Sequence, residues 1–146
     1  MEAGILSVWP ERGCGWICRR DLDRGGDSPT LLNPDYKEEE EEVEVFYYCA
    51  LCSNRIASAK QIIEMKGSHT HYYANPFGLV FGIGCFATAP GVLSKGTPTL
   101  ENTWFAGYSW CYSFCGFCYT HLGWRYLSQF DSGSFYGLIM DRLIRE

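Results

Sequence analysis

Two short stretches decide the fold, Cys49-Ala50-Leu51-Cys52 and Cys115-Gly116-Phe117-Cys118, because they repeat one spacing in distant parts of the chain. A Cys-x2-Cys turn directs two thiolates at one point, and a second turn completes the tetrahedral set that a structural zinc ion prefers. We therefore predict one zinc ion per chain, held by Cys49, Cys52, Cys115 and Cys118. Four thiolates leave no open coordination position, so a catalytic zinc is disfavoured; a redox dithiol or an iron–sulfur cluster is a lesser alternative.

The composition limits the class of protein. A chain of 146 residues suffices for one domain with a core, and its aromatic fraction of 16% favours β structure with a binding surface. The formal net charge of −5, with scattered Lys and Arg, argues against a nucleic-acid partner. No segment reaches the roughly 20 apolar residues that span a bilayer, and the first residues lack the basic region of a signal peptide. We predict no membrane partner and a cytoplasmic or nuclear location, with secretion as the alternative if the natural N-terminus differs.

The composition changes sharply at Val43. Residues 1–42 contain turn dipeptides with little periodicity and end in an acidic run, so we predict a loosely ordered tail with an acidic linker. Residues 43–146 alternate β-branched and aromatic runs with turn residues, which predicts a mainly β zinc-binding domain. A short helical turn is expected near the end, between Phe135 and Ile144.

Three tryptophans lie close to the second cysteine pair. Trp104 and Trp110 are an even number of positions apart, so in an extended chain their side chains face the same side. The same holds for Trp124 and Tyr126. Core packing would explain any one of these residues, but three tryptophans beside a zinc site favour a small apolar cage. Such a cage suits a methylated ammonium, through cation–π attraction, or a small flat ring whose polar edge meets backbone groups of the loop before Trp104. The spacing alone does not choose between these ligands.

Four motifs occur in a characteristic order: Asn75-Pro76-x-Gly78, Trp104-Phe105-x-Gly107-Tyr108-x-Trp110, Cys115-x2-Cys118 and His121-Leu122-Gly123-Trp124. In order, spacing and residue type they resemble the CULT domain, the thalidomide-binding domain at the C-terminal end of cereblon, over roughly residues 45–144. The resemblance implies a β-tent fold, in which two antiparallel sheets at a large angle are pinned by a four-cysteine zinc site. It also implies that the three tryptophans form the walls of the cage.

The resemblance further implies a small-ligand binding module that is not an enzyme. The family binds the glutarimide ring of thalidomide-type drugs, uridine, hydantoin-like rings and C-terminal cyclic imides of damaged proteins. The imide edge would meet the backbone around Asn102 and Trp104, and Asn75 would lie in the loop that closes over the ligand. Four positions depart from animal cereblon. Histidines stand there in place of Asn102 and Phe77, a phenylalanine in place of Tyr126 at the pocket floor, and a proline in place of Ala106 in the bend.

Two other functions remain open from the sequence. The β-tent architecture also resembles methionine sulfoxide reductase B, whose activity would require a nucleophilic thiolate, here Cys85 or Cys111. A methyl-lysine reader is the second alternative. Cereblon is the substrate receptor of a ubiquitin ligase through additional domains, for which the residues before Val43 leave no room. We therefore do not expect a ligase adaptor as a partner of this chain alone, unless it is a fragment of a longer cereblon-like protein.

Overall fold

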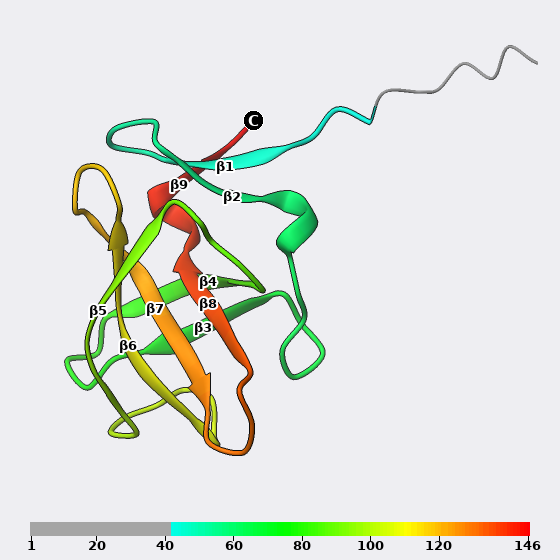
Figure 1. The fold of residues 1–146 in the computed structure, drawn as a ribbon. Helices are drawn as coiled ribbons and strands as arrows, with labels where there is room; N and C mark the ends of the chain where they lie inside the picture. The colour runs from blue at the N-terminus through cyan, green and yellow to red at the C-terminus, as the bar shows by residue number, and fades with distance from the viewer. Residues whose placement is uncertain (1–41) are drawn as a thin grey trace, which may run out of the picture. The chain divides into compact units, whose positions relative to one another are not determined.

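The computed structural model describes residues 42–146, which form two antiparallel sheets (Figure 1). Nearly all of the predicted N-terminal tail lies outside the described residues. The smaller sheet has the order β2-β1-β9, with β1 (Phe46–Cys49), β2 (Arg55–Ser58) and β9 (Leu143–Arg145). The larger sheet has the order β3-β4-β8-β7-β6-β5, with β3 (Thr70–Ala74), β4 (Val80–Phe86), β5 (Val92–Thr99), β6 (Tyr108–Cys115), β7 (His121–Ser128) and β8 (Ser134–Ile139). The predicted mainly β fold with two antiparallel sheets is confirmed.

Helical structure within residues 42–146 is limited to two short 3₁₀ turns, η1 (Ala59–Gln61) and η2 (Met140–Arg142). The first turn begins where the Ser58 hydroxyl accepts a hydrogen bond from the Lys60 N–H at 3.1 Å, a typical N-cap. The second connects β8 to β9 and lies within the segment where a helical turn is expected. In the described part of the chain, no helix is long and apolar enough to cross a membrane.

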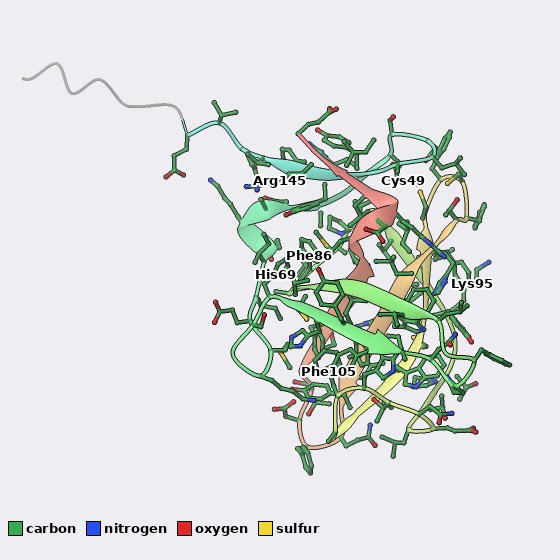
Figure 2. The ribbon with its side chains drawn as sticks, turned by 180° about the vertical axis from the view of Figure 1, so that it is seen from behind. Cys49, His69, Phe86, Lys95, Phe105 and Arg145 are labelled. Carbon is green, nitrogen blue, oxygen red and sulfur yellow. The ribbon has the colours of Figure 1, made fainter. Side chains whose placement is uncertain are left out.

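The core consists of two clusters of buried side chains. One lies where the two sheets meet and includes Phe86, and the other lies against the larger sheet and includes Phe105. Figure 2 shows Phe86 nearer to the smaller sheet than Phe105. The period-two alternation of strands explains this division, since each strand of the larger sheet sends alternate residues to opposite faces.

The pairing of β6 with β7 contains an irregularity that matters for the site. Ser113 lies opposite Gly123, and Phe114 lies opposite His121, so Leu122 is an extra residue in β7. A bulge of this kind bends its strand and changes the direction of the neighbouring side chains. Gly123 has a φ of 150° here, a conformation that side-chain-bearing residues rarely adopt.

The two ends of the described domain are joined by hydrogen bonds. The N–H of Phe46 donates to the carbonyl of Glu146 at 2.7 Å, and the N–H of Glu146 donates to the carbonyl of Phe46 at 3.0 Å. The strands that carry these ends, β1 and β9, are neighbours in the smaller sheet. The first and last described strands therefore lie side by side in the same sheet.

Candidate functional site

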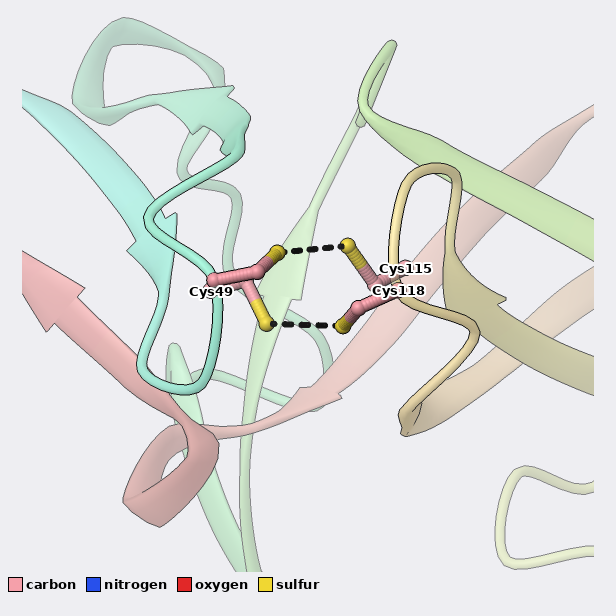
Figure 3. A group of neighbouring side chains, drawn as sticks. Cys49, Cys115 and Cys118 are labelled. Atoms are coloured by element: carbon pink, nitrogen blue, oxygen red, sulfur yellow. Dashed lines mark hydrogen bonds between the residues drawn. The ribbon is translucent and has the colours of Figure 1, made fainter.

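The four predicted metal ligands come together between the two sheets. Their sulfur atoms all lie within 4.8 Å of one another. The Sγ atoms of Cys49 and Cys118 are 3.7 Å apart, and those of Cys52 and Cys115 are 3.6 Å apart (Figure 3). A tetrahedral zinc ion with Zn–S bonds of about 2.3 Å needs sulfur atoms about 3.8 Å apart. The four sulfur atoms therefore lie at the distances that would hold a metal ion, and the cluster brings the β1–β2 loop next to the β6–β7 loop.

The two cysteine loops have the same backbone structure. The N–H of Ser53 donates to the carbonyl of Cys49 at 2.8 Å, and the N–H of Tyr119 donates to the carbonyl of Cys115 at 3.0 Å. Ser53 and Tyr119, which directly follow the second cysteine of each pair, have positive φ values of 58° and 62°. The matching turns bring the two thiol pairs face to face. The repeated spacing in the sequence thus corresponds to a repeated local structure.

Thr120 and Asn54 contact two of the four sulfur atoms, whereas burial raises the pKa of Cys49 and raises that of Cys52 to about 12. The side chain of Thr120 and then its backbone lower the pKa of Cys118 to about 6 through hydrogen bonds, which favours the thiolate that a metal requires. The side-chain amide of Asn54 donates to the Sγ of Cys115 at 3.6 Å and to the carbonyl of Gly91 at 3.3 Å. Such contacts hold ligands in position before metal binds.

A cavity of about 490 Å³ opens on the larger sheet. Its lining contains all six residues predicted to bind ligand, which are Asn75, Asn102, Trp104, Trp110, Trp124 and Tyr126. It also contains Pro76, Phe77, Phe81, Thr99, Glu101, Tyr112 and His121. The structure therefore brings together residues from the β3–β4 turn, the β5–β6 loop and strands β4 to β7. Their part in ligand binding stays a prediction.

The aromatic walls of the cavity are held at large angles to one another. The rings of Trp104 and Trp124 are 4.8 Å apart with an interplanar angle of 73°, and Phe81 packs against Trp124 at 75°. The indole N–H of Trp104 donates to the carbonyl of Ala74 at 3.2 Å, and that of Trp110 donates to Glu101 at 2.8 Å. Because both N–H groups are already bonded, the indole faces are fixed before any ligand arrives.

Lys66 supports the Trp104 wall, a role that the sequence did not reveal. Its Nζ donates to the carbonyl of Trp104 at 3.1 Å and lies 5.2 Å from the ring centre of Phe105. Tyr73 stacks on Trp104 with a ring separation of 5.3 Å and an angle of 20°. Lys66 and Trp104 are 38 positions apart, so no local pattern could have linked them.

Asn75 shapes its loop through its side chain. Its Oδ1 accepts hydrogen bonds from the N–H groups of Phe77 at 3.0 Å and Leu79 at 2.9 Å. An asparagine that caps a turn in this way fixes the path of the backbone. The loop at the cavity mouth is thus ordered by Asn75, with Pro76 and Phe77 placed at the opening.

His121 was not among the predicted site residues, yet it lines the cavity beside Trp124. The two rings are 5.0 Å apart with an angle of 85°. The Nε2 of His121 lies 2.9 Å from the carbonyl of Gly123, to which it donates, and Nδ1 faces the Arg142 guanidinium at 3.3 Å, from which it accepts. These partners define a neutral imidazole with its proton on Nε2.

This imidazole predicts a pH dependence. Burial, and then the charge of Arg142, lower the pKa of His121 below its ordinary value of 6.5. Below pH 6.5, His121 binds a proton more readily in the unfolded chain than in the folded one. The stability that the neutral imidazole contributes is therefore fully present above pH 6.5, and it is lost as the pH falls toward the folded pKa. We expect the melting temperature to fall from about pH 7.5 to about pH 6 more steeply in the natural protein than in His121→Gln. If the melting temperatures of the two proteins fall equally with pH, this expectation is contradicted. Both proteins keep the four cysteines, so loss of metal at low pH would affect both alike.

Neither cysteine considered as a nucleophile lines the cavity. Cys111 lies on β6 between Trp110 and Tyr112, so its side chain points to the opposite face from theirs. Cys85 is fully buried, and this burial raises the pKa of its thiol to about 11. A thiol in such surroundings is a poor nucleophile. The arrangement lacks, within residues 42–146, the thiolate that a sulfoxide reductase would require in its pocket.

Comparison with known proteins relates this chain to cereblons. No family model matches it. It is 30% identical over 118 residues to protein cereblon of Drosophila simulans, which covers 74% of this chain and 19% of that protein. The cereblons of Drosophila pseudoobscura pseudoobscura and Drosophila melanogaster are 30% identical over 105 and 103 residues, which cover 65% and 66% of this chain. In both, the match spans 16% of the relative.

Proposed function

This chain carries a cereblon-like CULT domain, and from that premise we propose that its cavity binds small cyclic imides or uracil-like rings without transforming them. Natural ligands of this class would include cyclic imides at the C-termini of modified proteins. The observation that carries the proposal is the pair of perpendicular indoles, Trp104 and Trp124, beside a turn with free backbone groups. A flat ring of glutarimide size can lie against both indole faces and bury its apolar surface there.

The turn before Trp104 supplies the polar partner for such a ring. Asn102 has a φ of 52°, which turns its backbone sharply at the cavity. Within residues 42–146, the N–H and C=O of Asn102 and the N–H of Trp104 have no backbone partner. An imide presents C=O, N–H and C=O along one edge, so it needs a donor, an acceptor and a donor in return. The Trp104 N–H, the Asn102 carbonyl and the Asn102 side-chain amide offer that sequence of groups.

We infer that the metal is zinc and that its role is structural. Four thiolates are the ligand set of closed zinc sites and leave no position for substrate. The ion would fix the β6–β7 loop, and the two strands that leave this loop carry Trp110 and Trp124 into the cavity. Metal site and cavity are thus two sites on one hairpin. If the chain is part of a longer cereblon-like protein of the cytoplasm or nucleus, the domain would serve there to recognise substrates of a ubiquitin ligase.

Calorimetric titration of the zinc-loaded protein tests the proposed function. Thalidomide and uridine should each bind saturably at one site, and a trimethyllysine peptide should not. Trp110→Ala removes one wall and should weaken binding about 100-fold, as expected for an aromatic anchor. Tyr72→Ala is the matched control, because Tyr72 is 74% exposed on β3 and lies outside the cavity lining. Failure of both rings to bind a folded, zinc-loaded protein would refute the proposal, and selective binding of trimethyllysine would favour a methyl-lysine reader.

A further inference from the structure

Arg142 has contacts with both the first cysteine loop and a residue that lines the cavity. It is the last residue of η2, the short turn that connects β8 to β9 and passes beside the β1–β2 loop (Figure 3). The carbonyl of Arg142 accepts a hydrogen bond from the N–H of Ala50 at 3.0 Å. Ala50 directly follows the predicted ligand Cys49, and Cys49 itself pairs with Leu143, the residue after Arg142. The backbone of Arg142 is therefore attached to the first cysteine loop.

The side chain of Arg142 reaches the other cysteine loop. Its Nη1 donates to the backbone carbonyl of His121 and lies 3.3 Å from the Nδ1 of the same histidine. His121 begins β7, three positions after the predicted ligand Cys118. Among residues 42–146 the one ion pair joins Lys60 to Glu42, so no carboxylate there competes for the guanidinium. One residue thus joins the two cysteine loops through contacts that do not include the four sulfur atoms.

His121 extends this connection into the cavity. Its ring lies 5.0 Å from that of Trp124 at an angle of 85°, and both residues line the cavity. The Nε2 of His121 donates to the carbonyl of Gly123 at 2.9 Å, while the other ring nitrogen faces Arg142. Because both nitrogens have partners, the imidazole cannot rotate without losing a hydrogen bond. The contacts form a continuous path from the first cysteine loop through Arg142 to the Trp124 wall.

We propose that Arg142 is a positioning residue that couples the cysteine cluster to the cavity, so that a change in the spacing of the sulfur atoms moves the Trp124 wall. Such coupling travels through contiguous packed and hydrogen-bonded groups, and Arg142 and His121 supply them. The inference rests on the proposed zinc ion and is independent of which ligand the cavity takes. Strand β7 is a second route from the cysteine loop to Trp124, but only the first route depends on the Arg142 guanidinium.

Fluorine NMR of the full chain labelled with 5-fluorotryptophan tests this role, because each indole gives its own resonance and Trp124→Phe identifies that of Trp124. Cadmium is a larger ion than zinc that also binds four thiolates, so exchanging zinc for cadmium widens the cluster while the loops stay joined. The Trp124 resonance of the natural protein should move on this exchange. In Arg142→Met, which keeps an unbranched side chain without a donor, the movement should be lost.

Two further variants make the comparison specific. Arg142→Lys keeps a charged donor but has a single amino group, so it should show a smaller movement than the natural protein and a larger one than Arg142→Met. Arg145→Met is the matched control, because Arg145 is an exposed arginine on the adjoining strand β9 and its loss should leave the movement unchanged. A thermal melt and a measurement of bound metal accompany each variant.

Each outcome decides between the routes. If the Trp124 resonance of the natural protein does not respond to the metal exchange, or responds equally in Arg142→Met, the role of Arg142 is overturned. If Arg142→Met does not fold, equal movement in Arg142→Lys and Arg145→Met overturns it instead, and a smaller movement in Arg142→Lys supports it. If the natural protein binds neither metal, the measured metal content shows that the proposed zinc site fails, and the coupling fails with it. The proposed ligand is tested separately by calorimetry, so its failure would leave the role of Arg142 standing.

Discussion

Replacing Cys115 with alanine is expected to lower the free energy of unfolding by about 5 kcal/mol or more, enough to unfold a domain of this size. Cys115 is fully buried, and its Sγ lies 3.6 Å from that of Cys52. Without it, three thiols remain to hold an ion that ordinarily takes four. The β1–β2 loop then loses its main connection to the β6–β7 loop. A metal chelator should have the same effect on the natural protein.

Thermal unfolding followed by circular dichroism, together with measurement of bound zinc, checks this expectation. Cys111→Ala is the matched control, because Cys111 is also buried, with 7% of its surface exposed, but lies outside the metal cluster. Cys111→Ala should lower the free energy of unfolding by about 1 kcal/mol, because it leaves a small cavity, and it should keep one zinc per chain. Equal melting temperatures and equal zinc content in the two variants would contradict a stabilising metal.

The second large effect is expected from Gly123→Ala, which should destabilise the domain by about 4 kcal/mol or more. A Cβ at this position would lie 2.1 Å from the carbonyl oxygen of Gly137 and 2.9 Å from the Cα of Leu138. Both contacts are with the backbone of β8, which cannot move aside without breaking its pairing with β7. The φ of 150° adds strain for any residue with a side chain.

Gly96→Ala separates the effect of the close contact with β8 from the effect of the positive φ. Gly96 also has a positive φ, 97°, but a Cβ there would meet no atom within 4 Å. Gly96→Ala should therefore lower the free energy of unfolding only by the strain of the positive φ, about 1 kcal/mol. Equilibrium denaturation of both variants gives the comparison. If Gly123→Ala is no less stable than Gly96→Ala, close approach of the strands is not what requires glycine at this position.

The clustering of the four cysteines could be predicted because its evidence is local. A Cys-x2-Cys spacing specifies one half of a tetrahedral site, and two copies leave few other arrangements. The strand content could be predicted for the same reason, since alternation is a short-range pattern. The order β3-β4-β8-β7-β6-β5 could not, because antiparallel pairing of distant strands depends on contacts that no window of the sequence contains.

His121 shows why part of the cavity could not be predicted. In a regular strand, residues three apart face opposite sides, so simple alternation separates His121 from Trp124. The extra residue Leu122 shifts the pairing and places both rings in the cavity lining. A bulge is a property of two paired strands, so it cannot be predicted from the sequence of one strand alone. Gly123 is the residue that permits the bulge here. Lys66 was missed for a related reason, since its partner Trp104 becomes a neighbour only after folding.

The reciprocal hydrogen bonds between Phe46 and Glu146 have a consequence for protein architecture. Because the two ends of the domain are adjacent, a host protein can accommodate it as a guest inside a surface loop without separating the ends of that loop. The same closeness allows a circular permutant, in which a short linker joins the ends and a new opening is cut elsewhere. In either setting the attachment point is the three-stranded sheet, and the cavity on the six-stranded sheet is left free for its ligand.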